Sequence, residues 1–188
     1  MERSSSKKIA FYGVMAGLMF VFLLIETYLF SALFGNFTPA ILTLPLAVAL
    51  SLFNGKRGMW VGGTVFGCCS FFLAIIISNV IFLNPLVSIL PRVFIGGTAF
   101  LVYWGSSKLF KNAKSEFVKE TLPCALAGVF GILTNTVFTI FMMWVFNAAA
   151  IAMVFTVVIS INFVAEVIGA AILAPIYVKL FKRLQKQL

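Results

Sequence analysis

The stretch IAFYGVMAGLMFVFLLIETYLFSAL, residues 9–33, is mostly apolar and contains one charged side chain, Glu26. A helix needs about 20 predominantly apolar residues to cross a bilayer. Because the run is longer than this, it predicts a membrane-spanning helix. It is also too long for the apolar core of a secretory signal, and no small-residue cleavage site ends it, so we expect it to be retained.

Similar runs recur along the chain of 188 residues, of which 62% are hydrophobic and 10% charged. We therefore expect an all-α integral membrane protein, folded as a single substrate-binding bundle of six transmembrane helices over residues 1–188. The second run contains Pro45 and is shorter than a bilayer requires. The predicted spans cover residues 9–33, 41–53, 59–78, 86–104, 121–146 and 151–178.

The 14 basic residues are distributed unevenly between the two faces of such a bundle. The N-terminal segment, the second loop, the fourth loop and the C-terminal tail carry three, two, four and four of them. Positive charge is retained in the cytoplasm during insertion, so we expect both termini to be cytoplasmic in a multi-pass protein of the bacterial cell membrane. The lipid bilayer is then a sufficient partner for these charges, and no nucleic acid is expected.

The remaining basic residue is Arg92, which ends the segment NPLVSILPR, residues 84–92. An arginine at bilayer depth is costly and is seldom found there without a partner. Its planar fork of donors fits a carboxylate or a phosphate. We predict that Arg92 binds an anionic group of a ligand that arrives from outside. The alternatives are an internal ion pair with Glu26 or Glu166, or a side chain that extends to the outer interface.

Glu166 lies in the sixth predicted span, one turn after Asn162, so the two side chains share a helix face. Glu166 can serve proton coupling or bind the ligand. A structural hydrogen bond between helices is the interpretation that we favour. Asn162 is a further candidate for ligand binding.

Three more asparagines are candidates for the ligand site. Asn135 lies in the middle of the fifth span, where its amide either binds a polar ligand or fastens one helix to another. Asn79 and Asn84 lie in the loop before the fourth span. Ordinary loop capping is the default for both, and ligand binding is the alternative that their nearness to Arg92 in sequence suggests.

The first span also carries small residues near its cytoplasmic end. Gly13 and Gly17 are four residues apart, and Ala10 and Ala16 accompany them. Small side chains let a second helix approach closely in lipid. The pattern predicts close packing, either within the bundle or on a partner subunit.

The residue types that are missing exclude several function classes. The chain has no histidine and no aspartate, so metal sites and catalytic triads built on them are excluded. The three cysteines show no pairing or metal-binding spacing, and no phosphate-binding glycine loop is present. We expect no enzyme activity, no metal and no cofactor, which leaves binding and translocation.

Taken together, these features resemble the substrate-binding S components of energy-coupling factor (ECF) vitamin transporters. The resemblance rests on six spans with both termini inside, on small residues that open the first helix, on the segment NPLVSILPR, and on Asn135 in the fifth span. It implies a membrane subunit that binds a water-soluble vitamin from outside with high affinity. It also implies a transmembrane coupling subunit and two cytoplasmic ATPase subunits as partners. Members dock through an AxxxA-type motif, to which Gly13-xxx-Gly17 is the nearest match.

The resemblance also suggests a vitamin. Segment 84–92 is similar to that of pantothenate-type members, and the carboxylate, amide and hydroxyls of pantothenate match Arg, Asn and Thr side chains. Folate, which also carries carboxylates, riboflavin and pyrimidine or pyridoxine-like vitamins are alternatives within the family. A stand-alone proton-coupled carrier and a structural or regulatory membrane subunit without a small ligand are the alternatives outside it.

Overall fold

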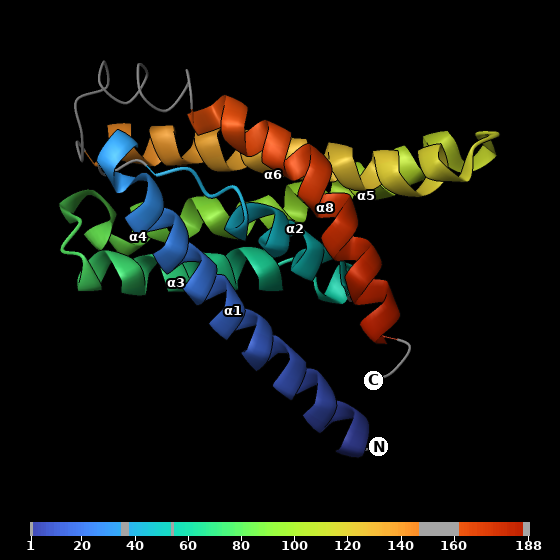
Figure 1. Ribbon diagram of the computed structural model, residues 1–188, viewed down its shortest axis with the longest axis horizontal. Helices are drawn as coiled ribbons and strands as arrows, with labels where there is room; N and C mark the ends of the chain where they lie inside the picture. The colour runs from blue at the N-terminus through green and yellow to red at the C-terminus, as the bar shows by residue number, and fades with distance from the viewer. Residues whose placement is uncertain (1, 35–37, 54, 147–161, 186–188) are drawn as a thin grey trace.

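The computed structural model describes residues 2–34, 38–53, 55–146 and 162–185, which form helices without a strand. The long helices are α1 (Glu2–Phe34), α2 (Thr43–Phe53), α3 (Val61–Ile76), α5 (Leu90–Leu109), α6 (Glu116–Val145) and α8 (Phe163–Gln185). The shorter helices are η1 (Gly55–Arg57), η2 (Val80–Leu83), α4 (Pro85–Ser88) and η3 (Phe110–Asn112). The predicted all-α fold is therefore confirmed for the described part of the chain (Figure 1).

Five apolar segments among these residues are long enough to cross a bilayer, as expected of a multi-pass membrane protein. They cover Ile9–Ser31, Gly55–Ile76, Pro85–Asn112, Glu116–Val145 and Phe163–Leu184. The predicted second span is a helix, but it has only 11 residues. At 1.5 Å per residue it is about 16 Å long, about half of the hydrocarbon thickness. Residues 151–161 of the predicted sixth span lie outside the described residues.

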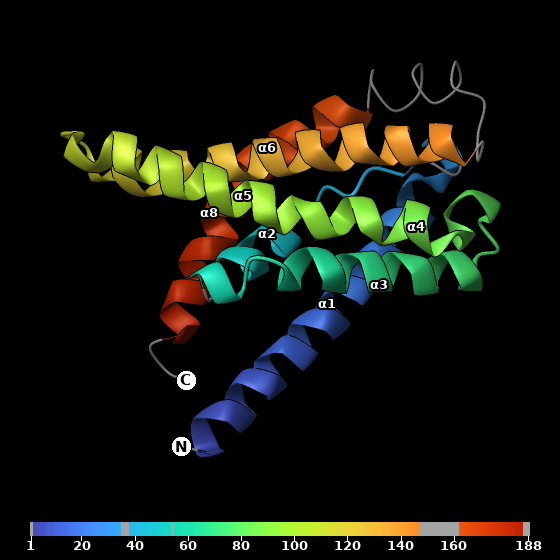
Figure 2. The same ribbon diagram turned by 180° about the vertical axis from the view of Figure 1, so that it is seen from behind.

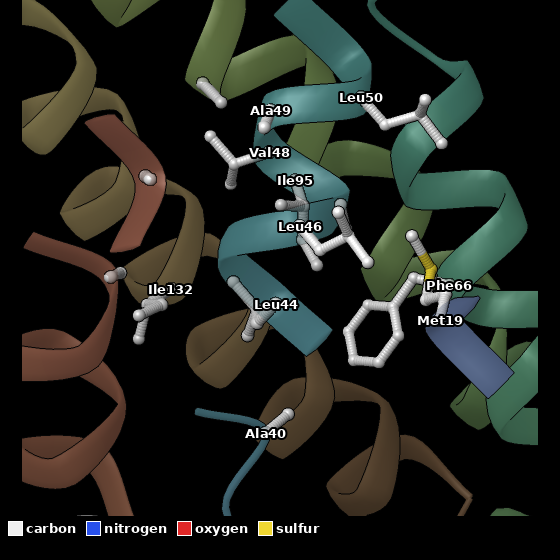
Figure 3. Packing of buried hydrophobic residues seen from close by; sticks show 14 of the residues in the cluster. Met19, Ala40, Leu44, Leu46, Val48, Ala49, Leu50, Phe66, Ile95 and Ile132 are labelled. Atoms are coloured by element: carbon white, nitrogen blue, oxygen red, sulfur yellow. The ribbon is translucent and has the colours of Figure 1, made fainter. Parts of the chain in front are cut away.

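Helix α2 forms the centre of the bundle instead of one of its walls. Every residue from Thr43 to Ser51 is buried, and α2 contacts α1, α3, α5, α6 and α8. Figure 3 shows side chains leaving α2 on all sides, among them Leu44, Leu46 and Leu50. A helix that is apolar on all faces must be surrounded by protein or lipid, and here protein surrounds it. Pro45 fits because it lies in the first turn, where no intrahelical donor is needed.

The outer surface of the bundle is apolar and exposed. On α1, the exposed side chains include Val14, Val21, Ile25 and Leu29, and comparable residues line the outer faces of the other long helices. A water-soluble protein rarely shows so much contiguous apolar surface. In a bilayer these side chains contact lipid, which is why the apolar pattern of the sequence continues beyond what the core requires.

The two ends of the bundle differ. Phe11 of α1, Phe53 of α2 and Phe181 of α8 pack together, with ring centroids 4.5 to 5.9 Å apart. The start of α1 and the end of α8 therefore lie at one end, where the connection between α5 and α6 is also found, and the connection from α3 to α4 lies at the other (Figures 1 and 2). The segments predicted to carry the cytoplasmic charge are thus brought to the same end.

Glycines allow α2, α3 and α5 to pack at backbone distance. A Cβ at Gly63 would overlap the carbonyl oxygen of Arg92, and one at Gly67 would lie 3.0 Å from the Cα of Ile89. A Cβ at Gly96 would overlap the carbonyl oxygen of Met59 and the side chain of Ser51. Gly63-xxx-Gly67 is thus the small-residue pair that packs inside the bundle. It holds α3 against the start of α5.

This packing predicts the effect of a single methyl group. Gly96→Ala should destabilise the protein by about 1–3 kcal/mol, because α5 would have to move away from Met59 in the turn before α3 and from Ser51 of α2. The matched control is Gly105→Ala on the same helix, where a Cβ has no neighbour within 4 Å. Thermal unfolding of both variants in detergent measures the difference. Equal melting temperatures for the two variants would show that the close contact does not limit stability.

Candidate functional site

A cavity of about 330 Å³ lies inside the bundle, at the end away from the Phe11–Phe53–Phe181 cluster. Its walls come from α1, α3, α5, α6 and α8, from the segment before α2 and from the connection between α3 and η2. Tyr28 and Ser31 of its lining are exposed, so the cavity reaches the surface beside α1. Its polar lining residues are Thr27, Tyr28, Ser31, Thr38, Ser70, Asn79, Arg92, Asn135, Thr136, Thr139, Asn162 and Glu166.

Arg92 is buried in the wall of this cavity and is only 7% exposed. Its Nη1 donates a hydrogen bond to the carbonyl oxygen of Ser88. Its guanidinium carbon lies 5.0 Å from the ring centroid of Phe66 and 5.2 Å from that of Phe82. Its Nε has no hydrogen-bond partner. Among the described residues no carboxylate lies within ion-pair distance of Arg92, so neither of the predicted alternatives, an internal ion pair or a surface position, is found.

Segment 84–92 places this side chain. Asn84 caps α4 by accepting a hydrogen bond of 3.0 Å from the backbone N–H of Leu86, and Pro85 occupies the first helical position. Pro91 lies at the start of α5, where its missing N–H is tolerated. The chain therefore turns between α4 and α5, and the carbonyl of Ser88 is directed at Arg92.

The two loop asparagines differ in their position relative to the cavity. Asn84 is absent from the cavity lining, and its side chain caps α4. Asn79 does line the cavity, and its Oδ1 also accepts a hydrogen bond of 3.3 Å from the backbone N–H of Ile81. The default of loop capping thus describes Asn84 fully and Asn79 in part.

The two membrane glutamates meet the N-terminus of α2. Glu166 of α8 accepts a hydrogen bond of 2.9 Å from the backbone N–H of Ala40. Glu26 of α1 accepts hydrogen bonds from the backbone N–H groups of Leu42 and Thr43 and from the hydroxyl of Thr43. The first N–H groups of a helix have no partner within it, and they favour negative charge. Oε1 of Glu166 therefore makes a structural hydrogen bond, which connects α8 to the segment before α2 instead of to another helix.

Only one of these glutamates belongs to the cavity. Glu166 lines it, whereas Glu26 is 2% exposed and lies outside its lining. Asn162 lines the cavity one turn before Glu166, as their spacing predicts. The cavity thus brings together Arg92, Asn79, Asn135, Asn162 and Glu166 from the predicted candidates.

Helix α6 supplies polar groups that sequence reasoning missed in part. Asn135 was predicted, but Thr139 one turn later also lines the cavity, and both carry a buried side-chain oxygen without a hydrogen-bond partner. Thr27 and Ser31 repeat the same spacing on α1. Polar residues four apart on an otherwise apolar helix share one face, and this signal would have identified both pairs.

The small residues of α1 lie far from the cavity lining. Ala10, Gly13 and Gly17 are exposed, and a Cβ at either glycine would have no neighbour within 4 Å. Ala16 is half-buried, and its carbonyl oxygen accepts a contact of 3.7 Å from the Sγ of Cys69 on α3. Packing within the bundle therefore uses Ala16 and leaves the two glycines open.

The fold and the cavity together define the class: a multi-pass α-helical membrane protein with a buried polar cavity. No protein-family model matches this chain, and no curated protein matches its sequence.

The cap of α2 leads to a stability prediction. Glu26→Ala would leave three donors of residues 42 and 43 without their acceptor. We expect a loss of about 1–3 kcal/mol for each donor that stays buried and unsatisfied. Chemical or thermal unfolding in detergent measures it. Glu120→Ala, at an exposed position of α6, is the control, with an expected change of less than about 0.5 kcal/mol. A loss at Glu26 no larger than at Glu120 would contradict the capping role.

Proposed function

We propose that this protein is the substrate-binding S component of an ECF-type vitamin transporter, and that its vitamin is pantothenate. The observation that carries the proposal is the buried guanidinium of Arg92, which lines a cavity and has no acidic partner in the described part of the chain. The likeness of segment 84–92 and of the six-span pattern to S components supports the family.

The energetics of Arg92 favour an anionic ligand. A charge removed from water is destabilising unless it is paired and hydrogen-bonded. One carbonyl and two aromatic faces compensate the guanidinium only in part, and Nε remains without an acceptor. A carboxylate in the cavity would supply both the opposite charge and two acceptors in the geometry that the guanidinium fork prefers.

The rest of the cavity suits pantothenate. Its volume of about 330 Å³ is at the low end for small-molecule sites, which favours a compact vitamin over folate or riboflavin. Asn135 and Thr139 offer groups that can bind an amide or a hydroxyl. Leu73, Ile140 and Met143 offer an apolar surface for the two methyl groups of pantothenate.

The proposed orientation follows the charges. The basic N-terminal segment, loops and tail would face the cytoplasm, and the cavity would open to the outside of a bacterial cell membrane. The sequence contains no phosphate-binding glycine loop. The resemblance to S components implies two ATPase subunits and a transmembrane coupling subunit, which would dock on the open small-residue face of α1 around Gly13 and Gly17.

Ligand binding by the purified protein tests the proposal. In a panel of water-soluble vitamins, pantothenate should raise the melting temperature, and a ligand at 100 times its Kd should stabilise the protein by about 2.7 kcal/mol. Arg92→Ala should weaken binding by about 2–5 kcal/mol, because it removes the charge partner of the carboxylate.

The control for this experiment is Arg57→Ala, at an exposed position in η1, which should bind as the unmodified protein does. Stabilisation by no vitamin of the panel would contradict the S-component proposal. An unchanged affinity in Arg92→Ala would contradict the proposal that Arg92 binds the carboxylate, while leaving a vitamin-binding role in place.

The docking face can be tested separately. Gly13→Leu and Gly17→Leu add bulk where the structure has open space, so both variants should fold and bind pantothenate normally. Uptake by vesicles that contain the coupling and ATPase subunits should fall at least tenfold, because the helices can no longer approach closely. Gly105→Leu, at another open position, is the control. Normal uptake by the α1 variants would place the docking face elsewhere.

A further inference from the structure

The cavity has a hydrogen-bond donor, Arg92, on one wall and a hydrogen-bond acceptor, Glu166, on another. The proposed function uses only the donor. Arg92 enters from α5, and Glu166 enters from α8 on a different wall, with α6 packed against both helices. Glu166 is 9% exposed, so it is buried like Arg92. The two side chains line one cavity without forming an ion pair with each other.

The hydrogen-bond acceptors that line the cavity are only partly satisfied by the protein. Glu166 uses Oε1 for the backbone N–H of Ala40, and it lines the cavity as a buried carboxylate that forms no ion pair with Arg92. On the neighbouring wall, the buried Oδ1 of Asn135 also has no donor. A ligand with an anionic group and an otherwise apolar body would satisfy Arg92, but it would bring no donor to the Glu166 carboxylate and would leave Oδ1 of Asn135 buried without one, which is unfavourable.

We propose that Glu166 is a specificity-determining residue that accepts a hydrogen bond from an O–H or N–H group of the ligand, on a part of the ligand distinct from the anionic group bound by Arg92. The ligand class is then a compact molecule that carries both a carboxylate and a strong hydrogen-bond donor. This inference rests on the proposed function and deepens it, because pantothenate carries two hydroxyl groups remote from its carboxylate.

The role of Glu166 is positional as well as chemical. Because its Oε1 holds Ala40, and because Ala40 and Thr38 themselves line the cavity, the carboxylate has a fixed orientation before the ligand arrives. A fixed acceptor discriminates more strongly than a mobile one, since an analogue that lacks the donor leaves it unpaired.

Two ligands that differ only in their donors provide the test. The first is pantothenate, and the second is N-(3,3-dimethylbutanoyl)-β-alanine, which is pantothenate without its two hydroxyl groups. Isothermal titration calorimetry on the purified full chain gives both affinities. The unmodified protein should prefer pantothenate by about 10- to 100-fold, the range for a hydrogen bond to a charged group.

The variants assign that preference to a residue. Glu166→Gln should reduce the ratio of the two affinities to within about threefold of unity, because the carboxylate acceptor is lost with little change in volume. Glu26→Gln, at the buried carboxylate outside the cavity lining, should keep the ratio. Arg92→Gln should weaken both ligands by the same factor and therefore also keep the ratio.

The outcomes separate this inference from the proposed function. If the unmodified protein binds neither compound, the pantothenate assignment and the inference both fail. If it binds both compounds equally, or if Glu166→Gln keeps the full preference, the inference alone is overturned. If Glu166→Gln fails to fold, as judged by size-exclusion chromatography, the comparison of the two ligands on the unmodified protein still decides whether the site recognises the hydroxyl donors of the ligand. A preference that is lost in Asn135→Ala and kept in Glu166→Gln would overturn the assignment to Glu166.

Discussion

The arrangement depends on the N-terminus of a helix that begins inside the bundle. Water is absent from the hydrocarbon region, so every backbone N–H group there needs a partner within the protein. Helix α2 is too short to bring its ends to both interfaces, and its first N–H groups are therefore buried. Glu26 of α1 accepts hydrogen bonds from Leu42 and Thr43 at the start of α2, and Glu166 of α8 accepts one from Ala40 just before it. These contacts connect α1 and α8 to α2, and the contact between Glu166 and Ala40 lies in the wall of the cavity.

Close packing at the glycines of α3 determines where Arg92 lies. Gly63 and Gly67 let the backbone of α3 approach Arg92 and Ile89, and the break between α4 and α5 directs the carbonyl of Ser88 at the guanidinium. Arg92 is thereby held against two aromatic rings, away from both glutamates. The separation matters physically, because two charges that neutralise each other would leave little for a ligand to bind.

The unpaired polar groups of the cavity determine which ligands would fit it. Buried donors and acceptors that find no partner in the protein favour ligands that supply one. Here the donor Nε of Arg92 and the acceptor Oδ1 of Asn135 lie on walls formed by α5 and α6. Apolar residues of the lining, such as Ile140 and Met143, lower the local polarity and so strengthen each polar contact. A small dipolar molecule meets these requirements better than a purely apolar one.

Much of this protein is determined by the sequence alone. The long apolar runs predict helices, because a helix is the structure in which a single segment can satisfy its own backbone hydrogen bonds in lipid. A lone arginine such as Arg92 marks a candidate site, because an isolated charge is unfavourable in lipid. Which polar groups meet is decided only by the tertiary structure. Hydropathy cannot tell that α2 is enclosed by protein, that Asn84 caps a helix, or that Glu166 faces Ala40 as well as the cavity. Those facts depend on how the helices rotate and cross, and rotation is set by contacts between residues far apart in the chain.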